Sequence, residues 1–98
     1  MPINARRRDA IAAAVAAYDS ANPKARLPRN AARLLAVMFP TTDVCQRSLQ
    51  DLAAEGFSRD RLPAMLRRLV ETGFLSRQQG SGAVPDAYRL HLPPMAQP

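Results

Sequence analysis

The stretch FSRDRLPAMLRRLVETGFLSR, Phe57 to Arg77, contains five arginines and one proline within a pattern typical of a helix. If Ser58 were the N-cap, Pro63 would be the fifth helical residue, and its ring would clash with a preceding carbonyl at a cost of about 3 kcal/mol. If Asp60 is the N-cap, Pro63 is the third helical residue, where the missing N–H would have no intrahelical partner anyway. The sequence therefore predicts a regular helix from Arg61, preceded by an irregular or 3₁₀ lead-in.

This helix is expected to continue to Glu71 or Thr72 and to end at Gly73, and to have two different faces. The face expected to be buried contains Leu62, Met65, Leu66, Leu69 and Val70. The opposite face contains Arg61, Ala64, Arg67, Arg68 and Glu71. On it, Arg61, Ala64 and Arg68 form an outward stripe, and an arginine fork matches either a guanine edge or phosphate oxygens. The alternative is a solvated charged face with Arg67 and Glu71 as an i,i+4 ion pair.

Two alternating segments, 74–78 and 88–92, flank the glycine-rich tip 80–82 and predict a β-hairpin. In the second segment, Tyr88, Leu90 and Leu92 are expected on one face. The tip suits a minor groove or a phosphate strand, because glycine allows close backbone approach. The hairpin side chains expected to contact DNA are Arg77, Gln78, Gln79 and Arg89. The alternative is an ordinary surface hairpin.

The N-terminal segment predicts an alanine-rich helix from Ala5 to about Ser20, capped by Asn4. Its larger apolar side chains fall on one face at i, i+4 and i+7 and are Ile11, Val15 and Tyr18. Because such a helix buries little area by itself, we expect this face to pair with a second copy of the chain as a dimerisation surface. The first turn carries Arg6, Arg7 and Arg8, which are interpreted as a phosphate-binding arm, a minor-groove arm or a solvated helix start.

Two shorter helices are expected between the N-terminal helix and the arginine-rich one. The first, 31–39, is capped by Asn30 and ended by Pro40, and the second runs from about residue 46 to 54 and stops at Gly56. Their core-facing residues are expected to be Leu34, Leu35, Met38, Leu49 and Leu52. The start of the second contains Arg47 and Ser48, which could contact phosphate.

The order helix, turn, helix, arginine-rich helix and hairpin is that of a winged helix-turn-helix domain. The sequence also resembles that superfamily directly, in a spacing made by Ser58, Leu62, Leu66, Leu69, Gly73, Phe74 and Leu75. The resemblance covers about Pro28 to Leu92. The superfamily includes MarR-like regulators and plasmid or phage regulators, and the resemblance does not distinguish between them. The stretch LQDLAAEGFS, Leu49 to Ser58, departs from the usual spacing to the turn glycine, which leaves the tilt of the recognition helix open.

The resemblance implies a mainly α fold with a small β-hairpin and an extra N-terminal helix. The expected organisation is an N-terminal helix at 1–22, a linker at 23–29, the winged helix-turn-helix domain at 30–92 and a disordered tail at 93–98. The full set of expected DNA-contact residues is Arg47, Ser48, Ser58, Arg59, Arg61, Ala64, Arg67, Arg68, Arg77, Gln78, Gln79 and Arg89.

Composition supports an acidic partner. The 98 residues carry a formal net charge of +6, and all but one of the 14 basic residues are arginine. This favours nucleic acid first and a membrane surface second. The segment from Arg6 to Ala21 could pass for a signal peptide, but Asp9 and the lack of leucine favour an amphipathic helix in a cytoplasmic protein. No run approaches the ~18 apolar residues of a membrane span.

The sequence offers no set of residues typical of catalysis or of metal binding. Cys45 cannot form an internal disulfide and is interpreted as a small apolar residue near a helix cap, with a redox sensor as the alternative. His91 has no cysteine or second histidine with which to share a metal. We therefore expect no enzymatic activity, no cofactor and no metal.

The sequence thus predicts a prokaryotic, homodimeric protein that binds double-stranded DNA and regulates transcription by occupying its site. A separate ligand-binding domain has no room in 98 residues, so no small-molecule ligand is expected. The alternatives are a winged helix that acts as a protein-interaction adaptor, and a DNA-architecture, replication or recombination accessory factor of a mobile element.

Overall fold

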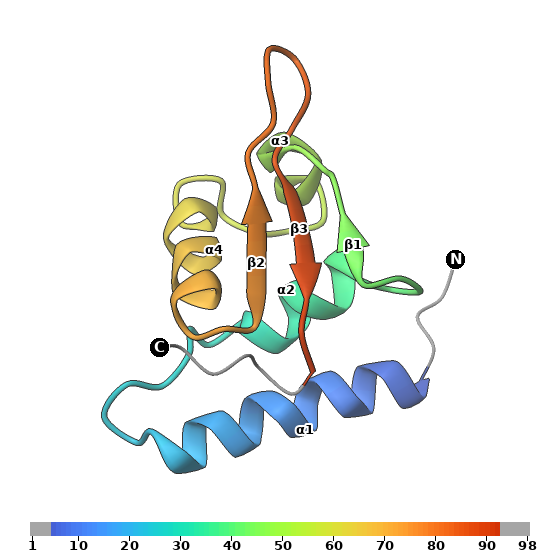
Figure 1. The fold of residues 1–98 in the computed structure, drawn as a ribbon. Helices are drawn as coiled ribbons and strands as arrows, with labels where there is room; N and C mark the ends of the chain where they lie inside the picture. Colours follow the sequence, from blue (N-terminus) through green and yellow to red (C-terminus); the bar gives the residue numbers. More distant parts are fainter. Residues whose placement is uncertain (1–4, 93–98) are drawn as a thin grey trace.

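Helical and extended segments follow one another along residues 5–92, the part of the chain that the computed structural model describes (Figure 1). The helices are α1 (Ala5–Ala21), α2 (Ala31–Met38), α3 (Leu49–Ala53) and α4 (Leu62–Glu71). The strands are β1 (Val44–Cys45), β2 (Leu75–Gln78) and β3 (Ala87–Leu90). The mainly α fold with a β-hairpin is confirmed, and β1 is an additional strand that the sequence did not predict. The expected Asn4 cap and the 93–98 tail lie outside the described residues.

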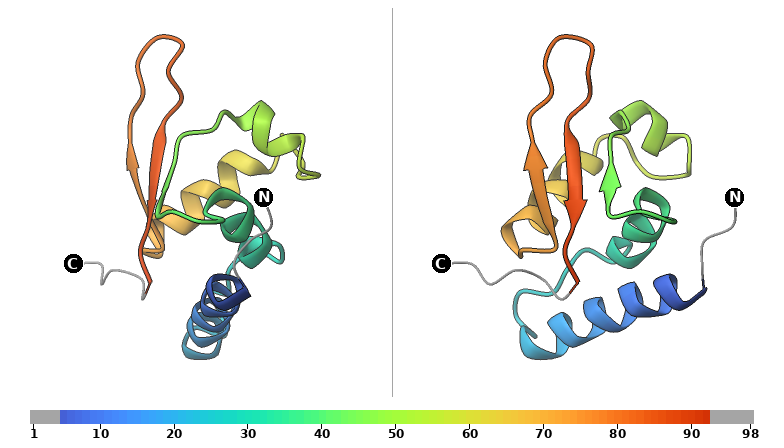
Figure 2. Two further views of the ribbon diagram at one scale, coloured as in Figure 1. Left: turned by 90° about the vertical axis from the view of Figure 1, so that its right-hand side faces the viewer. Right: turned by 45° about the vertical axis from the view of Figure 1, so that its right-hand side comes forward.

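The three strands form one antiparallel sheet in the order β1-β3-β2. The central strand β3 pairs with β1 through Val44 and Arg89, and with β2 through Leu75 and Leu90. Helices cover one face of this sheet, and no helix covers the other (Figure 2). A strand of two residues is too short to show alternation, so β1 could not be predicted from a periodic pattern.

Helices and sheet share one hydrophobic core. Its fully buried large side chains include Phe39 of the α2–β1 connection and Phe74, which directly precedes β2. The ring of Phe74 meets that of Tyr18 edge-to-face, with centroids 5.8 Å apart. The expected core residues of α2 are buried, whereas Leu49 is only partly buried and Leu92 is 37% exposed. Leu92 therefore lies outside the core, although it was expected on the same face as Tyr88 and Leu90.

The apolar face of α1 packs on this core. Ile11 is 1% exposed, and Val15 and Tyr18 are partly buried against the same cluster. The helix lies along the bottom of the domain beneath α2 (Figure 1). The expected contact of Ile11 with a second copy is corrected, because this side chain is buried within its own domain, whereas Val15 and Tyr18 are only partly buried. Homodimerisation itself stays a prediction.

Arg7 fixes the start of α1 to the α2–β1 connection. Its guanidinium donates to the carbonyl oxygens of Phe39 and Thr42, and its Nη2 lies 2.6 Å from Oδ1 of Asp43. The DNA-arm interpretation is therefore wrong for Arg7, since its donors are already used within the domain. The neighbouring Arg6 and Arg8 are exposed.

The start of α4 differs from expectation by one residue. Arg61 is the N-cap, with helical dihedrals (φ −92°, ψ −21°), and Pro63 is the second helical residue instead of the third. A lead-in turn precedes it, as expected: the carbonyl oxygen of Ser58 accepts from the N–H of Arg61 at 3.1 Å and of Leu62 at 3.0 Å. The helix ends at Gly73 (φ 88°), as predicted.

The caps of the shorter helices also correct the sequence analysis. Asn30 stands at the N-cap of α2, but its side chain makes no capping bond. α3 starts at Leu49, three residues later than expected, because Ser48 and Asp51 form a reciprocal capping box. Gly56 ends the following turn with φ 102°, a conformation that favours glycine.

Candidate functional site

A groove of about 610 Å³ separates the start of α3, one side of α4 and the β2–β3 hairpin. Three separate segments therefore build its walls. The arginines that line it are Arg47, Arg59, Arg67 and Arg77. We call this hollow the arginine groove. The helices that contribute to it lie on one side of the sheet, as Figure 2 shows.

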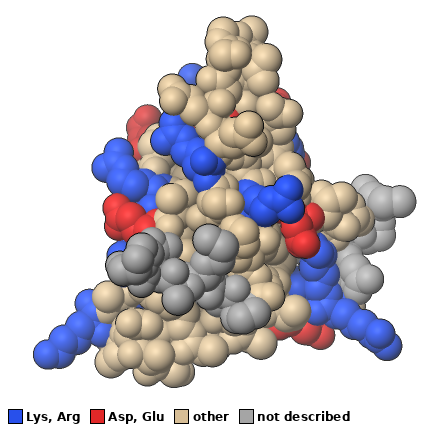
Figure 3. All heavy atoms as spheres, in the orientation of Figure 1, with Lys and Arg blue, Asp and Glu red and all other residues tan. Residues whose placement is uncertain are grey.

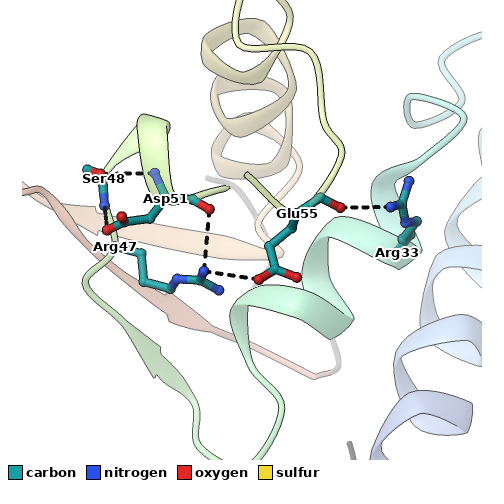
Figure 4. Close-up of polar contacts among 5 residues, drawn as sticks. All are labelled: Arg33, Arg47, Ser48, Asp51 and Glu55. Carbon is teal, nitrogen blue, oxygen red and sulfur yellow. Dashed lines mark hydrogen bonds and ion pairs between the residues drawn. The ribbon is translucent and has the colours of Figure 1, made fainter. Parts of the chain in front are cut away.

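Two of the four arginines are oriented by carboxylates. Nη2 of Arg77 lies 2.7 Å from Oδ2 of Asp86, whose Oδ1 accepts from the N–H of Gly80 at 2.8 Å. This hydrogen bond from Gly80, together with the Arg77 charge, holds the pKa of Asp86 below its ordinary value, against some desolvation. On the α3 side, Nη2 of Arg47 lies 3.5 Å from Oε1 of Glu55 (Figure 4).

The other two arginines, Arg59 and Arg67, are exposed. Within the described chain neither makes a hydrogen bond or an ion pair, so their donors are satisfied by solvent. Asp86 is the carboxylate that lines the groove, and it is paired with Arg77. The groove therefore carries uncompensated positive charge at Arg59 and Arg67, which suits an anionic ligand.

Strand register divides the hairpin residues expected to contact DNA. Arg77 pairs with Tyr88 across β2 and β3, and both line the groove. Because successive strand residues point to opposite faces, Gln78 and Arg89 lie on the other face of the sheet. That face is seen in Figure 3, where basic and acidic side chains are dispersed among uncharged ones. Gln79 is exposed beyond β2 and does not line the groove.

The outward stripe expected on α4 is only partly present. Arg61 and Ala64 are exposed, but neither lines the groove. Arg68 is tied down: its Nη2 donates to the carbonyl oxygen of Ala25 at 2.8 Å, and its Nη1 lies 3.7 Å from Glu71. The Arg67–Glu71 pair considered as the alternative is not formed, because Glu71 pairs with Arg68.

Serine side chains at the helix starts serve the local fold. The hydroxyl of Ser48 accepts from the N–H of Asp51 at 3.1 Å, and Ser48 also lines the groove. Ser58 is exposed, and its carbonyl oxygen supports the start of α4. Ser58 does not line the groove, so the structure does not join it to the arginines there.

The turn that positions Arg59 is held by Arg33 of α2, which sequence reasoning did not single out. Its guanidinium lies 4.6 Å from the centroid of the Phe57 ring and donates to the carbonyl oxygen of Glu55 at 2.9 Å (Figure 4). A side chain at Gly56 would meet this guanidinium at 3.0 Å. Arg33 of α2 thus holds the α3–α4 turn in place and so helps to set where α4 begins.

The hairpin tip is held by Asp86, which accepts from the N–H of Gly80 and pairs with Arg77. The sequence-based expectations did not include this role. A Cβ at Gly80 would lie 2.1 Å from the carbonyl oxygen of Val84, so only glycine fits there. An acidic residue that follows a turn opposite an arginine was the available signal for the Arg77–Asp86 pair. Asp86 was not among the site residues expected from the sequence.

Cys45 and His91 have structural surroundings. Cys45 is buried in β1, away from the expected helix cap, and burial raises its thiol pKa. Nε2 of His91 lies 2.9 Å from Oγ of Ser76. Within residues 5–92 no three His, Cys, Asp or Glu side chains could together hold a metal ion, and no helix is long and apolar enough to cross a membrane.

Comparison of the chain with known protein families, with curated proteins and with solved structures gives no match.

Proposed function

We propose that this protein binds double-stranded DNA through a winged helix-turn-helix arrangement and acts as a small transcriptional regulator by occupying its site. In this proposal α3 and α4 are the helix pair, α4 is the recognition helix and the β2–β3 hairpin is the wing. The observation that carries it is the arginine groove, with two guanidinium groups, Arg59 and Arg67, that lack a partner in the described chain.

The groove has a shape suited to one phosphate backbone. Its walls come from α4 on one side and the hairpin on the other, so a strand that passes between them meets arginines from both. The planar guanidinium group binds two phosphate oxygens at once, and phosphate contacts fix the register of a protein on a duplex. The ion pair with Asp86 holds Arg77 in place before DNA arrives.

Base reading is assigned to the exposed start of α4, where Arg61 and Ala64 lie outside the groove. In this motif the N-terminal residues of the recognition helix contact base edges. The DNA-contact set now centres on Arg47, Arg59, Arg61, Ala64, Arg67 and Arg77. Arg68, Gln78 and Arg89 leave it, because Arg68 is bonded to the linker and the other two lie on the far face of the sheet.

The proposal is tested by measuring duplex affinity against salt concentration. A plot of log K against log[salt] should have a slope of about −4 to −8, as expected for roughly five to nine neutralised phosphates. The double variant Arg59→Ala, Arg67→Ala should make the slope shallower by about 2. The matched control is Arg29→Ala, which removes an exposed arginine that does not line the groove. A flat salt response of the wild type would refute the proposal.

A further inference from the structure

The floor of the arginine groove is apolar, which backbone contact with a duplex does not require. Leu66 is 3% exposed, and Val70 and Tyr88 are partly buried, yet all three line the groove. On the hairpin side Val84 lines it as well and is 52% exposed. An anion-binding surface alone would gain nothing from these side chains.

We propose that the arginine groove binds an unpaired nucleic-acid strand, with its phosphates at Arg59 and Arg67 and its bases against the apolar floor. This inference deepens the proposed function and rests on it only in that the partner is nucleic acid. Each nucleotide supplies one anionic group and one flat, largely apolar group, and the groove offers a partner for each. Proteins that bind single strands combine a basic groove with aromatic side chains on which the bases stack, and Tyr88 is the aromatic residue that lines this groove.

The size of the groove favours a single strand over a duplex inside it. A volume of about 610 Å³ falls within the range of about 300–1,000 Å³ that is typical of small-ligand pockets. A duplex keeps its bases stacked, and its major groove alone is about 12 Å wide. A duplex can therefore place phosphates along the rim, but only an unpaired strand can bring bases to the partly exposed Val70 and Tyr88.

The chemistry of the walls favours nucleic acid over an acidic peptide. Two of the arginines, Arg47 and Arg77, already have protein carboxylates beside them. A peptide rich in Asp and Glu would add anions but no flat groups for the floor. Guanidinium groups also stack on planar rings, a contact that bases provide and carboxylates do not.

Two matched valine variants distinguish apolar contact between the bases and the groove from charge attraction between the phosphates and the arginines. Val84 lies in the groove, whereas Val44 is 46% exposed on β1 and does not line it. Fluorescence anisotropy would be measured with a labelled oligodeoxythymidylate 12-mer, which cannot pair with itself, and with a duplex of the same length. Val84→Ser should weaken binding of the single strand about fivefold and that of the duplex less than about twofold. Val44→Ser should change neither.

Each outcome decides between the two proposals. Single-strand binding that is weakened in Val84→Ser and unchanged in Val44→Ser supports the inference, whether or not the duplex binds. Duplex binding without any single-strand binding overturns the inference and leaves the proposed function standing. Absence of both kinds of binding overturns both. Equal loss in the two valine variants, or displacement of the oligonucleotide by polyglutamate at equal charge, would also overturn the inference. Circular dichroism confirms that both variants fold.

Discussion

The arginines of this protein fall into two regions that look alike in the sequence and differ in the structure. Outside the groove, Arg7, Arg33 and Arg68 donate to backbone carbonyl oxygens of other segments and so connect those segments to their own helices. In the arginine groove, Arg59 and Arg67 make no such bonds within the described chain. The number of basic residues therefore does not locate a binding surface. The contacts that each arginine makes within the fold distinguish the two groups.

The largest effect expected from this comparison concerns α1. Ile11→Ala should destabilise the protein by about 2–5 kcal/mol, because it removes a fully buried side chain from the shared core. Thermal or urea unfolding would measure the change in the free energy of unfolding. The sequence-based expectation was the opposite, since an arm used for dimerisation would leave the remaining domain folded when altered.

The control for this experiment is Ala12→Ser, an exposed substitution in the same helix, which should change stability by no more than about 0.5 kcal/mol. A small effect of Ile11→Ala, together with a shift from dimer to monomer in sedimentation, would instead support the dimerisation role. It would show that α1 leaves its own domain in solution.

Two adjacent arginines of α4 give the next largest effect and test the two regions directly. Arg68→Ala should destabilise the fold by about 1 kcal/mol, since it loses the hydrogen bond to Ala25, and should leave DNA affinity unchanged. Arg67→Ala should do the reverse: stability stays constant and the salt slope becomes shallower by about 1. Urea unfolding and DNA titration on both variants measure this. Equal effects on DNA binding would remove the distinction between the regions.

The sequence predicted the existence of the helices and hairpin well, because these depend on local signals. Gly73 ends α4, and the spacing of Leu62, Leu66 and Leu69 places the core face of that helix. The start of α3 was predicted three residues too early, because the capping box of Ser48 and Asp51 was not recognised in the sequence. The two-residue strand β1 was missed, since it exists only through its pairing with β3.

The site was predicted less completely, for reasons that lie outside any single element. A helical wheel shows that Arg68 points away from the core, but not that the linker at Ala25 lies beside it. Likewise, the alternation of β2 separates Arg77 from Gln78, but only packing against α4 decides which of them faces the groove. Four groove arginines were named in advance, whereas Asp86, Tyr88 and the apolar floor were not.

A smaller effect is expected from the titration of Asp86 at the hairpin tip. Its pKa is lowered chiefly by the hydrogen bond from Gly80, so the contacts of its carboxylate are fully present above its ordinary value of 3.8. They are lost as the pH falls through the lowered value. The amide resonance of Gly80 in NMR spectra should therefore shift in acid, below pH 3.8. In Asp86→Asn the acceptor remains but does not titrate, and that shift should be absent. A Gly80 shift that persists in Asp86→Asn would contradict this assignment.

The smallest effect is expected at Pro63, near the start of the arginine-rich helix α4. As the second helical residue, proline has the fixed φ that a helix start needs, and replacing it with alanine loses about 0.4–1 kcal/mol of that advantage. Alanine, however, regains an N–H that can donate to the carbonyl oxygen of Arg59, one turn earlier, worth about 0.5–1.5 kcal/mol. Because these terms oppose each other, Pro63→Ala should change the free energy of unfolding by less than about 1 kcal/mol, with circular dichroism unchanged. A stabilisation of about 3 kcal/mol would mean that the ring strains a helix interior. In that case α4 would begin near Ser58, and Arg59 would be placed within the helix itself.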